Sequence, residues 1–235
     1  MQLQPLGDRA LIVHLGDSID EVTHRRVRAV CARLDEHPPR GMIEYVPAYA
    51  SITLHYEPLA LEEPGAGAGT DSPYTRFASI VRAALANVAE ATTQAERLVE
   101  IPVYYGGEHG PDIEEVARQH ELLPSEVARL HAEGEYRVYM LGFAPGFAYL
   151  GGLPQRIATP RRQVPRTNVP AGSVGIGGNQ TGVYAIASPG GWQLIGRTPL
   201  RLFDAKRTPP ALLAVGDRVR FRAIAPDEYA RAQQP

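Results

Sequence analysis

Apolar side chains follow two different periods in the first 90 residues, and the period predicts which segments are strands and which are helices. Alternating apolar and polar residues predict strands at residues 2–6, 10–15, 42–46 and 51–56. Apolar residues recur at helical spacing over residues 19–34, with Asp17 and Ser18 as candidate N-cap residues. A second helix is predicted over residues 72–91, after small residues at 62–70 that predict a flexible loop. The order β-β-α-β-β-α is typical of a small α+β domain with one sheet and two helices.

The rest of the chain is richer in glycine and proline and has fewer helix signals. A strand is predicted at residues 99–104, followed by short helices at residues 112–120 and 124–132. Further short strands are predicted at residues 136–140, 183–187, 192–196 and 217–223. Short strands with regular turn signals favour a barrel or a sandwich. We therefore expect an α+β domain over residues 1–95 and a mainly-β domain over residues 96–235.

The composition is that of an ordinary globular protein, with 44% hydrophobic and 21% charged residues. The net charge of −2 gives no overall field that would draw the chain to nucleic acid or to an anionic membrane. No stretch of about 18 apolar residues is present, so we expect no membrane span and a cytoplasmic location. Cys31 is the single cysteine, and the histidines lack metal-binding spacing, so we expect neither a disulfide nor a metal site. His131 ends a predicted helix, where a protonated imidazole would favour the helix dipole.

Common catalytic motifs are missing from the sequence. Gly177 and Gly182 have the spacing of a phosphate-binding loop, but Val183 stands where that loop needs a lysine. Ser173 does not lie in a Gly-x-Ser-x-Gly nucleophile motif. The residues alone therefore indicate a polar, glycine-lined pocket for an amide or an anion, without a complete catalytic set.

An apolar stretch at residues 140–153 is interrupted by prolines and glycines at positions that no helix would keep. It is either a tightly folded core loop or an exposed aromatic surface that meets a partner or a ligand. Under the second interpretation, the candidate partner interface consists of Phe143, Phe147 and Tyr149.

Three further segments supply candidate site residues, which we expect to surround one cleft. Arg166 lies in a proline-stiffened loop, where it is either solvated or held ready to bind a carboxylate or a phosphate. The glycine-rich segment 169–184 either leaves backbone N–H groups bare for an anion or forms a simple hairpin, and its Gln180 suits a lactam amide. The candidate catalytic residues are Arg166, Gln180 and Arg197, and the candidate substrate-binding residues are Gly177, Gly178, Thr181, Tyr184 and Trp192.

Longer motifs occur over nearly the whole chain. They include Ile101-Pro-Val-Tyr-Tyr-Gly-Gly with Gly110-Pro-Asp, Gly142-Phe-Ala-Pro-Gly-Phe-Ala-Tyr-Leu, Pro160-Arg-Arg, Pro170-Ala-Gly-Ser-Val-Gly and Ser188-Pro-Gly-Gly-Trp. Together they resemble the PxpB/KipI family, which is also labelled allophanate hydrolase subunit 1 and carboxyltransferase-domain subunit. The resemblance implies a KipI-type N-terminal α+β domain, a C-terminal cyclophilin-like β-barrel and a partner of the PxpC/KipA type.

The same resemblance implies a subunit of an ATP-dependent 5-oxoprolinase, a hydrolase that opens the lactam of 5-oxoproline to glutamate together with PxpC- and PxpA-type subunits. It implies ATP with Mg as a co-substrate of the assembly, and we expect the chain to bind no cofactor and to be inactive by itself. Two alternatives are a biotin-dependent carboxyltransferase for urea or a related amide, and a KipI-like inhibitor of a sensor histidine kinase. The chain contains no Met-Lys-Met biotinylation segment and no Ser-Ser-Lys amidase residues, which favours the 5-oxoprolinase interpretation.

Overall fold

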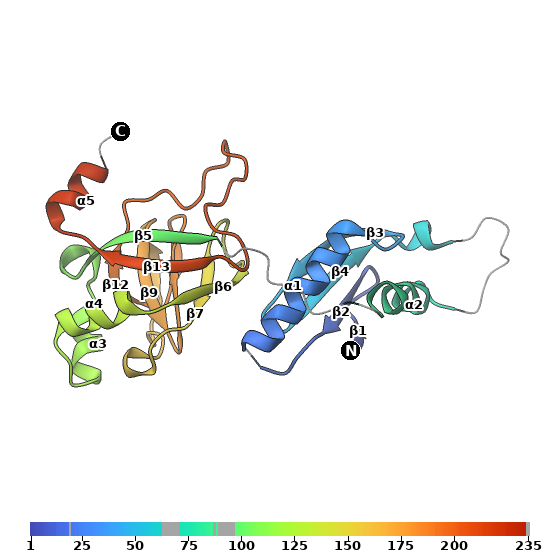
Figure 1. Ribbon diagram of the computed structural model, residues 1–235, viewed down its shortest axis with the longest axis horizontal. Helices are drawn as coiled ribbons and strands as arrows, with labels where there is room; N and C mark the ends of the chain where they lie inside the picture. The colour runs from blue at the N-terminus through green and yellow to red at the C-terminus, as the bar shows by residue number, and fades with distance from the viewer. Residues whose placement is uncertain (19, 63–70, 87, 89–96, 234–235) are drawn as a thin grey trace. The chain divides into compact units, whose positions relative to one another are not determined.

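The computed structural model describes residues 1–18, 20–62, 71–86, 88 and 97–233. The chain divides into two compact units, Met1–Gln94 and Ala95–Pro235. The helices and strands of both units are labelled in Figure 1.

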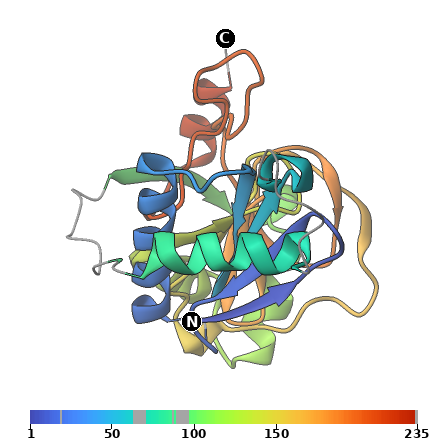
Figure 2. The same ribbon diagram turned by 90° about the vertical axis from the view of Figure 1, so that its right-hand side faces the viewer.

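The first unit contains an antiparallel sheet with the strand order β1-β2-β4-β3. The strands are β1 (Gln2–Pro5), β2 (Ala10–His14), β3 (Met42–Pro47) and β4 (Ser51–Tyr56). The helices are α1 (Glu21–Glu36) and α2 (Pro73–Leu85), and the short 3-10 helix η1 (Pro58–Leu61) follows β4. Figure 2 shows α2 along its length, with α1 beside it. These elements agree with the order predicted from the sequence.

One face of this sheet is buried under the helices. In β4 every second residue is buried, so Ile52, Leu54 and Tyr56 lie on the same face. They form one apolar core with side chains of α1 and α2, in which the rings of Tyr56 and Phe77 stack with centroids 4.4 Å apart. Because only one face of the sheet meets the helices, the strands keep the alternation that identified them in the sequence.

The ends of both helices differ from the sequence prediction. The N-cap of α1 is Asp20, whose side chain accepts a hydrogen bond from the backbone N–H of Thr23 at 2.8 Å, so the predicted caps at Asp17 and Ser18 are wrong. Helix α2 ends at Leu85, not at the predicted residue 91. The predicted loop lies outside the described residues from residue 63 to residue 70, as do residues 89–91 of the predicted helix.

The second unit contains a closed barrel with the strand order β10-β7-β6-β13-β5-β12-β9. In chain order its strands are β5 (Leu98–Tyr105), β6 (Tyr136–Leu141), β7 (Ala148–Gly151), β9 (Ser173–Gly177), β10 (Gln180–Val183), β12 (Gln193–Arg197) and β13 (Arg218–Ala223). Strands β5 and β13 run parallel, and the other neighbours are antiparallel. Strands β8 (Arg166–Val169) and β11 (Ser188–Gly190) pair as a separate ribbon. An α+β unit followed by a mainly-β barrel confirms the predicted fold class.

Short helices complete the second unit. They are η2 (Gly107–His109), α3 (Ile113–Gln119), α4 (Pro124–Glu133), η3 (Gln155–Ile157) and α5 (Pro226–Ala232). Helices α3 and α4 were predicted, with Pro124 in the first turn of α4. The sequence did not predict β7, β8, β9, β11 or α5. The strand predicted at residues 183–187 is wrong beyond Val183, where β10 ends and residues 184–187 turn away.

Candidate functional site

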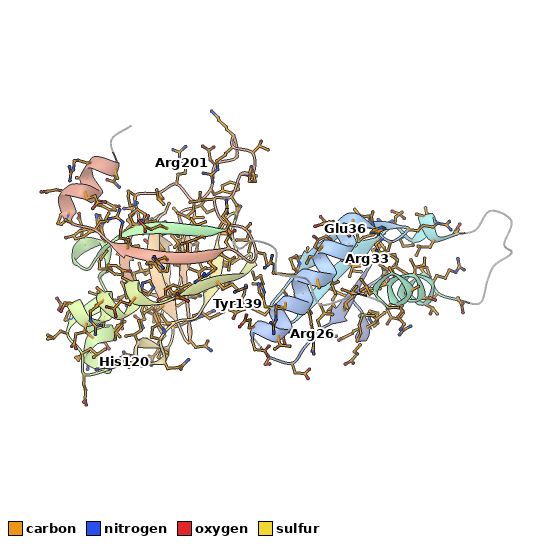
Figure 3. The ribbon with its side chains drawn as sticks, viewed as in Figure 1. Arg26, Arg33, Glu36, His120, Tyr139 and Arg201 are labelled. Carbon is orange, nitrogen blue, oxygen red and sulfur yellow. The ribbon has the colours of Figure 1, made fainter. Side chains whose placement is uncertain are left out.

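A polar hollow of about 650 Å³ lies beside α3 in the second unit. It is lined by Glu115 and Gln119 of α3, by residues 160–164, and by Gln193 at the start of β12. The far end of α3 is fixed by His120, labelled in Figure 3, whose Nε2 lies 2.9 Å from the Thr159 hydroxyl just before residues 160–164. We call this space the arginine hollow, because Arg161 and Arg162 lie in its wall.

A buried carboxylate, Asp112, connects α3, β12 and the arginine-bearing segment. Its side chain is 5% exposed, and its Oδ1 accepts hydrogen bonds from Arg162 Nη1 at 2.9 Å and from Arg166 Nη2 at 2.7 Å. Its Oδ2 accepts the backbone N–H of Leu194 at 2.7 Å, while its own N–H donates to the Leu194 carbonyl at 2.9 Å. The sequence prediction included Arg166 but missed Asp112, although the Gly110-Pro-Asp motif contained it.

The hollow has a surplus of positive charge. Asp112 balances one of the three cations Arg161, Arg162 and Arg166. Glu115 does not balance the others, because it is paired with Arg118 on α3 at 2.5 Å, and the hydrogen bond from that arginine lowers the Glu115 pKa. A cleft with this excess of positive charge attracts small anions.

Arg161 is held in a defined orientation by an aromatic ring. Its guanidinium carbon lies 5.6 Å from the centre of the Trp192 ring, within the range of a cation–π contact. A guanidinium lying over a ring keeps its N–H donors at its edge, where they can bind an oxyanion as a fork. Arg161 is therefore the arginine of this hollow that is best placed to hold a carboxylate or a phosphate.

Two buried polar atoms at the hollow have no hydrogen-bond partner among the described residues. Gln193 is 6% exposed, and its Nε2 donates to the Pro160 carbonyl at 3.0 Å, which fixes the orientation of the amide. Its Oε1 is left without a donor, and Arg166 Nη1 is left without an acceptor. Unsatisfied buried polar atoms cost free energy, so each indicates a missing partner such as a ligand or a water molecule.

The glycines of β9 and β10 make room for Trp192. A Cβ atom on Gly177 would lie 2.6 Å from the indole ring, and one on Gly182 would lie 3.2 Å from it. The N–H of Gly178, in the turn between the two strands, donates to the Thr159 carbonyl at 2.8 Å. The expectation that Gly177 and Gly178 offer bare N–H groups to a substrate is therefore corrected: side-chain packing and the turn explain these glycines.

The aromatic candidates divide into a core and an exposed ring. Phe147, Tyr184 and Trp192 are each at most 4% exposed and form one apolar cluster, so they are corrected from interface or substrate contacts to core residues. Tyr149 is half-buried beside them, with its ring 5.9 Å from that of Trp192. Phe143 is 64% exposed, with its ring 5.5 Å from that of Phe147.

Thr181 is fully buried in a chain of hydrogen bonds inside the barrel unit. Its hydroxyl donates to the Gly175 carbonyl at 2.9 Å, so the contact of 2.8 Å with His131 Nε2 requires an N–H on that nitrogen. His131 Nδ1 is then the acceptor for the Tyr105 hydroxyl at 2.8 Å. The expected substrate contact of Thr181 is corrected, because both functions of its hydroxyl are used within the protein.

The same chain of hydrogen bonds corrects the expectation of a protonated His131. Burial lowers the pKa of His131 from 6.5 to about 3, because desolvation disfavours the imidazolium. A neutral imidazole agrees with the donor and acceptor pattern of its two neighbours. His131 therefore acts as a structural residue of the core and not as a partner of the helix dipole.

Acid is expected to destabilise the barrel unit through His131. Unfolded chains bind a proton to this histidine below pH 6.5, whereas the folded state does so only near pH 3, so stability is full above 6.5 and falls as the pH drops. Between pH 7 and pH 5 the loss is about 2 kcal/mol in the free energy of unfolding. Urea titrations followed by Trp192 fluorescence should show this loss for the wild type but not for His131→Gln. An equal loss in both proteins would contradict the assignment.

The remaining candidates, Gln180 and Arg197, lie at separate places. Gln180 begins β10 and pairs with Gly177 across the hairpin. Arg197 ends β12, donates from Nε to the Ala171 carbonyl at 2.8 Å, and lines a second hollow of about 420 Å³ together with Arg201, which is labelled in Figure 3. The linings of the two hollows share no residue. The structure thus does not bring Arg197 into one cleft with the arginine hollow.

Neither a metal cluster nor a membrane helix is found in the described parts of the chain. There, no group of three or more His, Cys, Asp or Glu side chains is arranged to hold a metal ion. None of the described helices is long and apolar enough to span a bilayer. The site is thus defined by its arginines, by Asp112 and by Gln193.

Fold and site together define a protein of two units with an anion-attracting hollow in its β-barrel unit. Residues 1–213 match the family described as carboxyltransferase domain, subdomain C and D. The chain is 49% identical over 228 residues to a 5-oxoprolinase subunit of Bacillus subtilis (strain 168), covering 97% of this chain and 95% of that protein. It is 43% identical over 219 residues to the 5-oxoprolinase subunit of the same name from Escherichia coli O157:H7, covering 92% and 93%. The chain belongs to this carboxyltransferase-domain family, and the predicted membership of the PxpB/KipI family is confirmed.

Solved structures show the same fold. The crystal structure of TTHA0988 has a TM-score of 0.77 at 36% identity, covering 92% of this chain and 40% of that chain, so this chain spans less than half of that protein. Protein PH0987 from Pyrococcus horikoshii has a TM-score of 0.56 at 43% identity, covering 97% and 100%. Kluyveromyces lactis urea carboxylase has a TM-score of 0.73 at 19% identity over 97% of this chain and 22% of that chain, a likeness of fold alone.

Proposed function

We propose that this chain is a subunit of an ATP-dependent 5-oxoprolinase, which opens the lactam of 5-oxoproline to glutamate. The observation that carries the proposal is the 49% identity to the 5-oxoprolinase subunit of Bacillus subtilis over 97% of this chain and 95% of that protein. The relative from Escherichia coli, of the same name, supports it at 43% identity. The likeness to urea carboxylase, at 19% identity, supports a shared fold and favours no second function.

The proposed role of this chain is to hold the substrate while other subunits supply the rest of the chemistry. The partners would be subunits of the PxpC/KipA type and of the PxpA type, with ATP and Mg as co-substrate of the assembly. 5-Oxoproline carries a carboxylate next to a cyclic amide, and the arginine hollow offers surplus positive charge next to a buried amide side chain. This match of charges supports the hollow as the place where the chain meets the substrate.

ATP would be used to activate the lactam. An amide carbonyl is a poor electrophile, and transfer of the γ-phosphoryl group of ATP to the lactam oxygen makes its carbon a better one. Water then adds to that carbon, its oxygen stays in the new carboxylate, and phosphate leaves. The carbon–nitrogen bond breaks, the nitrogen takes a proton, and glutamate results. The phosphorylated lactam must be shielded from premature attack by water, which a cleft closed by a second subunit would provide.

Phe143 is the proposed contact with the PxpC/KipA-type subunit. Its ring is 64% exposed, although large apolar side chains are usually buried. Its φ of +70° is uncommon for a residue with a side chain and costs of order 1–3 kcal/mol. Strained residues of this kind gather at functional sites, and exposed aromatic residues gather at the centres of interfaces.

The Phe143→Asp variant is therefore expected to lose the partner while the chain stays folded. Replacing a central aromatic anchor by a charge weakens an interface by about 2 kcal/mol or more, which is thirtyfold or more in Kd. Co-purification with a PxpC-type subunit, followed by size-exclusion chromatography, measures the effect. Val164→Asp is the matched control, since Val164 is 74% exposed. Equal co-purification of the wild type and both variants would remove Phe143 from the interface.

A further inference from the structure

Gln193 carries the strongest sign of a specific ligand in the second unit. Its side chain lines the arginine hollow and is 6% exposed, and its amide orientation is fixed by the bond to the Pro160 carbonyl. The remaining atom, Oε1, has no donor within the part of the chain that the structure describes. An acceptor left in this state is satisfied by a ligand that brings an N–H or O–H group.

Arg161 supplies the complementary function in the same hollow. No hydrogen bond joins its guanidinium to another described residue, whereas Arg162 and Arg166 are engaged by Asp112. Its contact with the Trp192 ring limits its orientations, so less entropy is lost when its edge binds a planar anion. The hollow thus combines a prepared anion fork with a buried acceptor.

We propose that the arginine hollow binds a lactam carboxylate, with Arg161 holding the carboxylate and Gln193 Oε1 accepting the lactam N–H. This inference rests on the proposed function and assigns the substrate to named atoms. In 5-oxoproline one carbon separates the carboxylate from the ring nitrogen, so one small molecule carries both the anion and the donor. The hollow, at about 650 Å³, is within the usual size range of ligand sites.

Gln193 replaces Gln180 as the residue that recognises the amide. Gln180 was chosen from the sequence because a glutamine side chain can pair with a lactam, but Gln180 does not line the arginine hollow. Gln193 meets the same chemical requirement and lies in the wall that also contains Arg161. A phosphate ion would use the arginine but would leave the fixed acceptor without an amide donor.

The ligand reaches Gln193 only if the segment at residues 160–164 moves aside, because Oε1 is covered in the structure. That segment is held near Gln193 by the Pro160 bond and by the Arg162 N–H, which donates to the Gly191 carbonyl at 2.7 Å. Each such bond contributes about 1 kcal/mol net, so thermal opening is accessible. Ligand binding would then exchange an unsatisfied acceptor for a satisfied one.

Calorimetric titration of the full chain tests the proposal with three separate probes: L-5-oxoproline, 2-pyrrolidone, which lacks the carboxylate, and inorganic phosphate. We expect 5-oxoproline to bind more tightly than either of the others. Arg161→Met should weaken 5-oxoproline binding about tenfold or more, and Gln193→Met about three- to tenfold. Only Arg161→Met should also weaken phosphate binding. Arg201→Met is the matched control, since it removes the same charge from an exposed arginine in the second hollow.

Three results would overturn the assignment: no saturable binding of 5-oxoproline at millimolar concentration, phosphate binding more tightly than 5-oxoproline, or equal effects of the Arg161 and Arg201 variants. Circular dichroism checks the fold of each variant. If Gln193→Met fails to fold, the exposed Arg161 variant still decides the outcome.

The test also separates this inference from the proposed function. An assembly that forms glutamate with an unchanged KM for 5-oxoproline in both Arg161→Met and Gln193→Met would keep the proposed function and reject the site. An assembly of wild-type subunits that forms no glutamate would reject the proposed function, whatever the binding experiment shows.

Discussion

Asp112→Asn is expected to lower the free energy of unfolding of the barrel unit by about 3 kcal/mol. The carboxylate accepts two arginine donors on one oxygen and the Leu194 N–H on the other. An asparagine of the same size has one acceptor oxygen, and its NH₂ group would face either the guanidinium groups or the Leu194 N–H. At least one buried donor is left unpaired, and two arginines lose their balancing charge.

Urea unfolding followed by the fluorescence of Trp192, the single tryptophan, measures this effect in the barrel unit. The matched control is Glu115→Gln, an acid on α3 that is 41% exposed and pairs only with its neighbours on the same helix. Exposed pairs contribute little, so the control should change stability by less than about 1 kcal/mol. Equal shifts of the unfolding midpoint in the two variants would show that the Asp112 network contributes no more than an exposed ion pair.

Phe147→Asp is expected to prevent the barrel unit from folding. The Phe147 ring is 2% exposed and makes edge contacts with the rings of Tyr149, Tyr184 and Trp192 at 4.8 to 5.6 Å. Losing a buried phenylalanine costs about 3–5 kcal/mol, and a buried unpaired carboxylate adds several more. The sum is comparable with the whole stability of a typical domain, about 5–15 kcal/mol.

Without urea, this variant should show the red-shifted Trp192 emission of a solvent-exposed indole, together with loss of the native circular dichroism spectrum. Phe143→Asp, at the exposed end of the same aromatic segment, is the control and should keep both native signals. A native spectrum for Phe147→Asp, with loss of the partner alone, would restore the interpretation that Phe147 belongs to the interface.

The sequence predicted those elements whose two faces differ. Strands β2 and β4 have one face under helices, and their alternation made them visible. Every residue of β9 is buried, because one of its faces lines the barrel core and Trp192 covers the other. A strand buried on both faces shows no alternation, and its glycines resemble a turn. This is why β9 was interpreted as part of a glycine-rich pocket.

The site was less visible in the sequence, because its contacts join residues that are far apart along the chain. Asp112 bonds to residues 50, 54 and 82 positions away, and no spacing rule covers such separations. Arg166 could be predicted, since prolines beside an arginine are a local signal. The choice between Gln180 and Gln193 needed the fold, because only the barrel places Gln193 beside residues 160–164.

The central claim, that this chain is a working subunit of a 5-oxoprolinase, is tested most directly by reconstitution from purified proteins. This chain, a PxpC-type subunit and a PxpA-type subunit are mixed with 5-oxoproline, ATP and Mg, and each protein is omitted in turn. We expect glutamate and ADP from the complete mixture, no turnover when any subunit is missing, and no ATPase or lactamase activity from this chain alone. Glutamate formed at the full rate without this chain would contradict the claim. So would turnover of urea only with a biotinylated partner, or tight binding to a sensor histidine kinase without any turnover.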